Sequence, residues 1–241
     1  MKLLEETIKS IYPQDSSFRD KAKERLEKLA MPYWAMGELM DISIDIAGMT
    51  RSLKPVFKKK AVVTMAADHG VTEEGISKYP SEVTTQMVYN FINGGAGINA
   101  MAMQVNADVF VVDMGVKSDL KDLVEKGKLI NKKVGLGTGN ITKGPAMSRA
   151  MAVRSLESGI DIVNDLIDKK YTLIGTGEMG IGNTTPSTAI ASVITEKKID
   201  QLTGRGTGLD DEQLEIKKKI IKKALEKNQP DPKDGIDILQ K

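Results

Sequence analysis

Cysteine is absent from the 241 residues of the chain. Its absence excludes disulfides, thiolate metal ligands and a cysteine nucleophile. Histidine and tryptophan occur once each, and aromatic residues make up only 4% of the chain. No apolar run approaches the length of about 20 residues that a bilayer-spanning helix needs, and no group of His, Asp and Glu shows metal-ligand spacing. We therefore expect no metal, no cofactor and no membrane partner.

A strong excess of charge is also lacking, because 35 Lys and Arg residues face 33 Asp and Glu residues for a net charge of +2. This balance gives no support for nucleic acid or an acidic membrane as a partner. The first residues, Met1–Glu6, are charged and lack the apolar core of a signal peptide. A lysine-rich chain without cysteine suits a reducing cytoplasm or a warm habitat, and we expect a cytoplasmic protein.

Alternating strand and helix patterns predict an α/β fold. Continuous apolar runs predict buried parallel strands at Ala61–Ala67, Val109–Val112 and Tyr171–Ile174. Apolar spacing also predicts helices. The first is capped by Ser16 or Ser17 and stopped by Pro32, and the last runs from the Asp210/Gln213 capping box to about Leu225. Between these two, the same spacing predicts helices at Met40–Met49, Ser81–Asn90, Asn99–Val105 and Met147–Leu166.

This order of elements predicts a Rossmann-like fold in three layers, with a parallel sheet and helices on both of its faces. A small helical part precedes the sheet. We expect an N-terminal helical region at residues 1–55 and an α/β nucleotide-binding domain at residues 56–241, incomplete at its C-terminus.

The most informative segment, Gly175–Thr188, reads Gly-Thr-Gly-Glu-Met-Gly-Ile-Gly-Asn-Thr-Thr-Pro-Ser-Thr. It joins a short apolar run to the helix-compatible run Thr184–Ile194, so the pattern is strand, glycine loop, helix. Glycines let the backbone approach a ligand, and the N–H groups at a helix start attract anions. The spacing matches neither the P-loop nor the dinucleotide fingerprint, and a tight turn without ligand remains an alternative.

One carboxylate, Glu178, lies inside this glycine-rich run. An acid beside a phosphate cradle is explained if a sugar hydroxyl or a developing positive charge lies next to the phosphate. Other polar residues follow the other strands, where open α/β sheets place ligands. Asp68 either holds a substrate hydroxyl or caps a loop, and His69 is either a catalyst or a structural hydrogen-bonding residue.

A series of short motifs runs from about residue 20 to the last residue of the chain. The motifs are Ala66–Val71, Glu74–Gly75, Tyr79–Pro80, Glu82–Thr84, Gln86–Val88, Gly94–Ala96, Asp113–Val116, Gly139–Ile141, Gly144–Ser148, Gly177–Thr185, Gly204–Gly208 and Asn228–Pro230. In this order they resemble the nicotinate-nucleotide:dimethylbenzimidazole phosphoribosyltransferase family (CobT-like).

The resemblance implies a pentosyltransferase that moves phosphoribose from nicotinate mononucleotide to an aromatic base, usually dimethylbenzimidazole, for the nucleotide loop of cobamides. It places the phosphate on N–H groups around Gly180–Thr184 and the ribose against Glu178, as the catalytic carboxylate. The substrate-binding residues would be Asp68, His69, Tyr79, Pro80, Met87, Gly177, Gly180, Ile181, Gly182, Asn183, Thr184, Gly206 and Lys217. Of these, Lys217 matches the family's phosphate-contacting lysine. A homodimer, or a dimer with a paralogue, is expected.

The chain departs from the family pattern in two places. The family's general base is a Glu in a glycine-rich segment of the C-terminal third, and no residue before Lys241 matches it. We therefore expect a fragment, a truncated form or a degenerate homologue, with little or no activity in isolation. The early loop of the family, Lys-Pro-x-Gly-Ser-Leu-Gly, is replaced by Met31–Gly37, which leaves the identity of the base open.

Three classes of function stay in competition. The first is a phosphoribosyltransferase that is active when complete. The second is a non-catalytic nucleotide-binding partner of a full-length paralogue. The third is an unrelated sugar-phosphate enzyme on a similar sheet, which the number of motifs disfavours.

Overall fold

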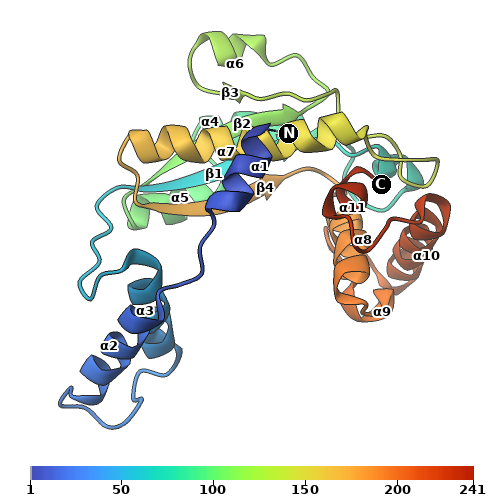
Figure 1. Cartoon of the computed structure of the whole chain (residues 1–241). Helices are drawn as coiled ribbons and strands as arrows, with labels where there is room; N and C mark the ends of the chain where they lie inside the picture. Colours follow the sequence, from blue (N-terminus) through green and yellow to red (C-terminus); the bar gives the residue numbers. More distant parts are fainter. Residues whose placement is uncertain (1) are drawn as a thin grey trace. The chain divides into compact units, whose positions relative to one another are not determined.

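The structure is a computed structural model that describes residues 2–241 and divides them into two units, residues 2–58 and residues 59–241 (Figure 1). Met1, with which the expected helical region begins, lies outside the described residues. Each unit has its own buried cluster of side chains.

The unit of residues 2–58 contains α1 (Lys2–Ser10), α2 (Ser16–Glu27) and α3 (Glu38–Thr50). Helices α2 and α3 pack through a small cluster that includes Ala22 and Ile44. The expected cap of α2 at Ser16 or Ser17 is wrong, because Asp15 caps this helix. Its Oδ1 accepts hydrogen bonds from the backbone N–H groups of Ser17 and Phe18, and a carboxylate is a strong acceptor for these donors.

The unit of residues 59–241 is built on a parallel sheet in the order β3-β2-β1-β4. The strands are β1 (Lys60–Ala67), β2 (Ala107–Gly115), β3 (Ile130–Asn131) and β4 (Leu173–Met179). The parallel α/β fold expected from the sequence is thereby confirmed. The sequence pattern missed β3, because a strand of two residues has no periodicity to detect.

Helices cover both faces of this sheet. On one face, α4 (Val83–Ile92) and α5 (Gly97–Gln104) pack over a cluster that includes Ala66, Val111 and Val88. On the other face, α7 (Arg149–Asp168) contributes Ile162 to a cluster with Val63. Successive strand residues point to opposite faces, so β1 and β2 contribute side chains to both clusters, as their continuous apolar runs predict.

Most of the remaining elements lie around the carboxyl ends of the strands. They are η1 (Gly70–Glu74), α8 (Thr184–Thr195), α9 (Ile199–Leu202), α10 (Asp211–Asn228) and α11 (Gly235–Gln240). Helix α6 (Lys121–Glu125) instead contributes Leu123 to the cluster that contains Val88. Figure 1 shows α8 to α11 grouped beyond the ends of the strands. The expected capping box of α10 is confirmed, with Asp210 and Gln213 each accepting a hydrogen bond from the other's backbone N–H.

Strand β4 extends further than the apolar run Tyr171–Ile174 predicts. It continues through the first glycines to Met179, and Gly177 pairs with Thr64 of β1. A Cβ atom on Gly177 would lie 3.0 Å from Thr64 Oγ1, so this glycine serves close strand packing. The glycine loop proper therefore begins at Gly180.

The order of connections fixes where a ligand binds in such a sheet. The chain passes from β1 to β2 by way of α4 and α5, and it returns from β3 to β4 by way of α7 on the opposite face. The direction of winding therefore changes at β1 and β4, and the crevice lies at their carboxyl ends. Across residues 2–241, none of the helices combines the length and apolar character needed to span a membrane.

Candidate functional site

The glycine loop lies in the crevice between β1 and β4. A Cβ atom on Gly180 would lie 2.9 Å from the ring of His69, which follows β1. Gly182 has φ +83°, and a Cβ atom there would approach Ile76 Cδ1 to 2.8 Å. Both positions therefore require glycine, one for a close approach and one also for its backbone conformation.

The loop uses only some of its N–H groups internally. The N–H of Ile181 donates to Thr84 Oγ1 at 3.0 Å, and that of Asn183 donates to Gly180 O at 3.0 Å. Within residues 2–241, the backbone N–H groups of Gly182 and Thr184 have no hydrogen-bond acceptor. The donors available to an anion are thus these two, next to the start of α8.

A buried cation lies beside these free donors. Lys217 of α10 is only 1% exposed, and its Nζ donates to Thr184 Oγ1 at 2.7 Å and to Gly204 O at 3.2 Å. Among the described residues its Nζ contacts a hydroxyl and a carbonyl but forms no ion pair with a carboxylate, and burial lowers its pKa. A buried ammonium without a counter-charge is costly, which supports an anionic ligand at this point. Gly206 also lies next to this ammonium group, because a Cβ atom on Gly206 would lie 3.2 Å from Lys217 Nζ.

A cavity of about 970 Å³ opens directly over the loop. We call it the loop cavity, and it is lined by Ile76, Ser77, Tyr79, Val83, Met87, Gly206, Thr207 and the segment 178–184. Of the expected contacts for a flat base, Tyr79 and Met87 line it, whereas Pro80 does not. Ser77 and Thr207, on the wall of this cavity, hydrogen-bond each other through their hydroxyls at 3.1 Å.

A second cavity of about 820 Å³ lies on the other side of the loop. We call it the histidine cavity, and its lining includes His69, Met65, Met114, Thr138, Ile190 and Leu239. Glu178, Met179 and Asn183 line both cavities, so the end of β4 separates them.

Glu178 is exposed at this dividing position. No hydrogen bond or ion pair joins its carboxylate to any residue between 2 and 241. A cap of the turn would require accepted N–H bonds, and none is formed. The Glu178 carboxylate is therefore accessible to a molecule in either cavity.

Asp68 has a different environment from that of Glu178. It is 2% exposed, and its two oxygens accept hydrogen bonds from Ser81 Oγ at 2.8 Å and from the N–H of Lys117 at 2.7 Å. It lines neither the loop cavity nor the histidine cavity. Of the two interpretations left open by the sequence, this geometry supports the fixing of loops.

His69 is enclosed but forms no side-chain hydrogen bond within the part of the chain that the structure describes. Burial lowers its pKa, with Asp68 acting weakly in the opposite direction, so the imidazole is neutral at pH 7. Its ring borders the histidine cavity and lies against Gly180. In the described residues no three His, Asp or Glu side chains are grouped as a metal site requires.

Sequence reasoning did not single out Thr84, which holds the loop from α4. The motif Glu82–Thr84 contains it, but the motif alone does not distinguish a hydrogen-bonding threonine from one that only packs in the core.

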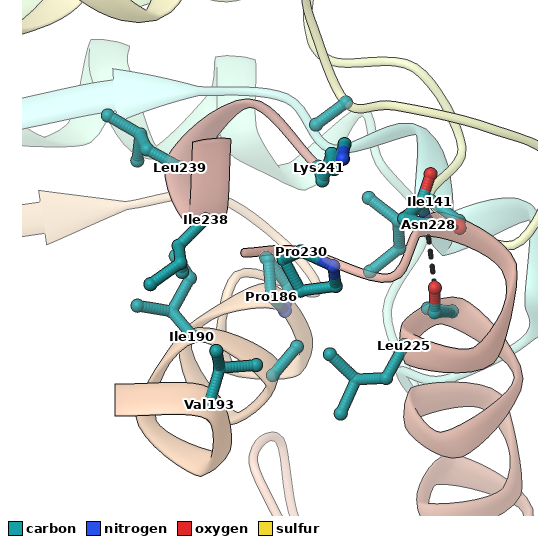
Figure 2. A pocket seen from close by; sticks show the side chains of 13 residues that line it. Ile141, Pro186, Ile190, Val193, Leu225, Asn228, Pro230, Ile238, Leu239 and Lys241 are labelled. Carbon is teal, nitrogen blue, oxygen red and sulfur yellow. Dashed lines mark hydrogen bonds between the residues drawn. The ribbon is translucent and has the colours of Figure 1, made fainter. Parts of the chain in front are cut away.

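A smaller apolar cavity, shown in Figure 2, lies between α8, α10 and α11 and is lined by Ile190, Val193 and Leu225 among others. Its wall is fixed by Asn228, whose Nδ2 donates to Ile141 O at 2.7 Å.

Fold and site together define an α/β protein whose strand ends form a cradle suited to a phosphorylated ligand. Comparison with known proteins agrees with this class. A family model described as "Phosphoribosyltransferase" matches residues 11–241. The chain belongs to the nicotinate-nucleotide–dimethylbenzimidazole phosphoribosyltransferase family.

Relatives of that name cover the whole chain. The protein of Desulfotalea psychrophila is 63% identical and that of Syntrophotalea carbinolica 51% identical, each over 241 residues, which are 100% of this chain and 68% of the relative. The crystal structure of CobT from Thermus thermophilus superimposes with a TM-score of 0.86 at 37% identity, over 93% of this chain and 66% of that one. The chain thus spans about two thirds of the length of these proteins.

Proposed function

We propose that the chain binds nicotinate mononucleotide and carries the phosphoribosyl-transfer site of its family. The acceptor is dimethylbenzimidazole or a related aromatic base, and the products are α-ribazole phosphate and nicotinate, for the nucleotide loop of cobamides. The α/β part, residues 56–241, is the nucleotide-binding part. The observation that carries the proposal is a buried Lys217 that has no counter-charge among residues 2–241, beside the N–H groups of Gly182 and Thr184, which have no acceptor there.

In this arrangement the nucleotide phosphate accepts from Gly182 N–H, Thr184 N–H and Lys217 Nζ, and charge-assisted bonds of this kind are strong. The aromatic base occupies the loop cavity between Tyr79 and Met87. The ribose lies between the phosphate and the aromatic base, next to Glu178, which borders both cavities.

The reaction breaks the bond from the anomeric carbon to the nicotinate nitrogen and forms one to a nitrogen of the incoming base. The nicotinate ring nitrogen is already positive in the substrate, so its departure needs no acid. Positive charge develops on the sugar as this bond breaks, and the Glu178 carboxylate stabilises it. The incoming base must lose its N–H proton to a general base.

That general base is expected outside these 241 residues, because no residue of the chain matches the Glu that the family uses. Losing a general base costs about 10²–10⁴-fold in rate. The 241-residue polypeptide by itself is therefore expected to release little nicotinate when dimethylbenzimidazole or p-cresol is the acceptor. A rate equal to that of a full-length relative would contradict this expectation.

A second candidate is a non-catalytic nucleotide-binding partner of a full-length paralogue, favoured by the same missing Glu. Both candidates are cytoplasmic in this proposal, as a homodimer or as a dimer with the paralogue. They separate in one assay, because a partner subunit raises the turnover of the paralogue and a transferase turns over when its general base is supplied.

Calorimetry with nicotinate mononucleotide tests the proposed placement. Gly182→Val should abolish measurable binding, because the new side chain meets Ile76 and Thr72 and blocks the donors. Gly127→Ala is the matched control, since Gly127 has a similar positive φ of +67° but nothing within 4 Å of a new Cβ. Equal binding by the wild type and Gly182→Val would refute the placement.

A further inference from the structure

Thr84 connects the two halves of the proposed site. It lies in the first turn of α4 and is 0% exposed. Its Oγ1 accepts the N–H of Ile181 at 3.0 Å, across 97 residues of sequence. Ile181 is itself only 6% exposed, so this N–H has no access to water as an alternative acceptor.

The same turn of α4 forms the wall of the loop cavity. Val83 and Met87, on either side of Thr84 along the helix, line this cavity. The start of the helix is anchored independently, because Ser81 Oγ donates to the buried carboxylate of Asp68. Helix α4 is therefore a fixed reference from which a single hydroxyl reaches the glycine loop.

The bond acts on the peptide unit that precedes the anion donors. Ile181 lies directly before Gly182, whose φ of +83° is accessible at low cost because it is a glycine. A loop of this kind can reorient its peptide units unless something fixes one of them. The hydrogen bond to Thr84 fixes the Gly180–Ile181 peptide unit. Only the two backbone torsions of Ile181, a β-branched residue of restricted conformation, separate this unit from the N–H of Gly182.

We propose that Thr84 is a positioning residue that orients the anion-binding N–H groups of the glycine loop relative to the base-binding wall. The inference rests on the proposed function, because it assigns the N–H of Gly182 to the phosphate of nicotinate mononucleotide. Thr84 itself touches no ligand, since it lines neither the loop cavity nor the histidine cavity.

Two substitutions separate positioning from packing. Thr84→Val keeps the shape of the side chain but removes the acceptor, and the affinity of the 241-residue chain for nicotinate mononucleotide should fall about 10-fold. Thr84→Ser keeps the acceptor and removes a methyl group, so it should lower the melting temperature but retain the affinity. The matched control is Thr188→Val on α8, because Thr188 is also buried and, within the described residues, its hydroxyl bonds only a carbonyl of its own helix.

Calorimetry and thermal melting of the wild type, Thr84→Val, Thr84→Ser and Thr188→Val test whether Thr84 acts by positioning. Loss of affinity in Thr84→Val alone supports the proposal. Equal affinity of Thr84→Val and the wild type overturns it, as does an affinity loss in Thr84→Ser that matches the loss in Thr84→Val. Failure of the wild type to bind the nucleotide refutes the proposed function instead, so the two failures are distinguishable.

Discussion

The carboxyl ends of β1 and β4 lie side by side, yet their polar groups are used in opposite ways. At the end of β1, both oxygens of Asp68 are occupied by protein donors, and its backbone N–H and C=O bond Gly115 and Thr138. At the end of β4, Glu178 has no protein partner among the described residues, and Lys217 beside the loop has no counter-charge there. The first end contributes structure, and the second leaves polar groups for a ligand.

This difference shows that an acid at a strand end is not by itself evidence for a site. Asp68 and Glu178 belong to equally conspicuous motifs in the sequence. What separates them is whether the protein itself supplies their hydrogen-bond partners. The comparison makes four measurements informative.

The largest effect is expected at Glu178. Glu178→Gln keeps the shape but removes the negative charge, and the rate of nicotinate release should fall on the order of 10²–10³-fold, the size seen when one preorganised stabilising group is lost. The assay uses a chimera in which this chain is joined to the part of the 63%-identical relative that has no counterpart in these 241 residues. A variant that keeps its melting temperature and its full rate would reduce Glu178 to a structural role.

Lys217→Met should separate binding from stability. Loss of the charged donor should weaken nicotinate mononucleotide binding on the order of 100-fold, or about 3 kcal/mol. The melting temperature of the free chain should stay the same or rise, because the variant no longer buries an unpaired charge. Calorimetry and thermal melting measure the two effects, and a parallel loss of both would contradict the comparison.

Asp68→Asn should show the reverse pattern. The amide oxygen can keep the N–H of Lys117, and the amide Nδ2 can donate to the Ser81 hydroxyl, which turns to accept. A charged acceptor is then replaced by a neutral one, and stability falls by about 1 kcal/mol. Denaturant unfolding gives this loss. The affinity of the folded fraction for the nucleotide should change less than about threefold, because the side chain lines neither cavity. A larger loss would make Asp68 part of the binding site.

The smallest effect concerns His69 and pH. Its folded pKa lies below the ordinary value of 6.5 because of burial, so the unfolded chain binds its proton first as the pH falls. The contribution of His69 to stability is complete above pH 6.5 and is lost as the pH falls from there through the folded pKa. His69→Gln should flatten the dependence of stability on pH in this window. The loss of stability at lower pH should remain, because it comes from carboxylates such as Glu74, whose pKa is lowered mainly by its hydrogen bond from Asn140. An unchanged slope would refute the assignment.

The sequence predicted the sheet and its main helices well, because the buried strands and amphipathic helices carry strong periodic patterns. The predictions from sequence were wrong where one sequence pattern is compatible with more than one local structure. The glycines after Ile174 suggested a loop, whereas Gly175 and Gly177 lie in β4 because a side chain at Gly177 would press against Thr64. The cap at Asp15 was missed because two serines beside it were equally good candidates.

The binding roles of the loop and the lysine stay predictions, but the structure brings two of these residues together. Lys217 Nζ donates to Thr184 Oγ1, although the two residues lie 33 positions apart in the chain. Which N–H groups are free depends on Thr84, which approaches only in the folded chain. The sequence could not rank Asp68 against Glu178 for the same reason, since tertiary hydrogen bonds decide it.

The ammonium of Lys217, which has no ion-pair partner among the described residues, has a further consequence for the proposed site. A cradle with a buried cation attracts small anions, and inorganic phosphate presents the same oxygens as the nucleotide. In the proposed arrangement, inorganic phosphate should therefore compete with the nucleotide and should also stabilise the folded chain. The apparent affinity of the chain for nicotinate mononucleotide should then fall as the phosphate concentration rises.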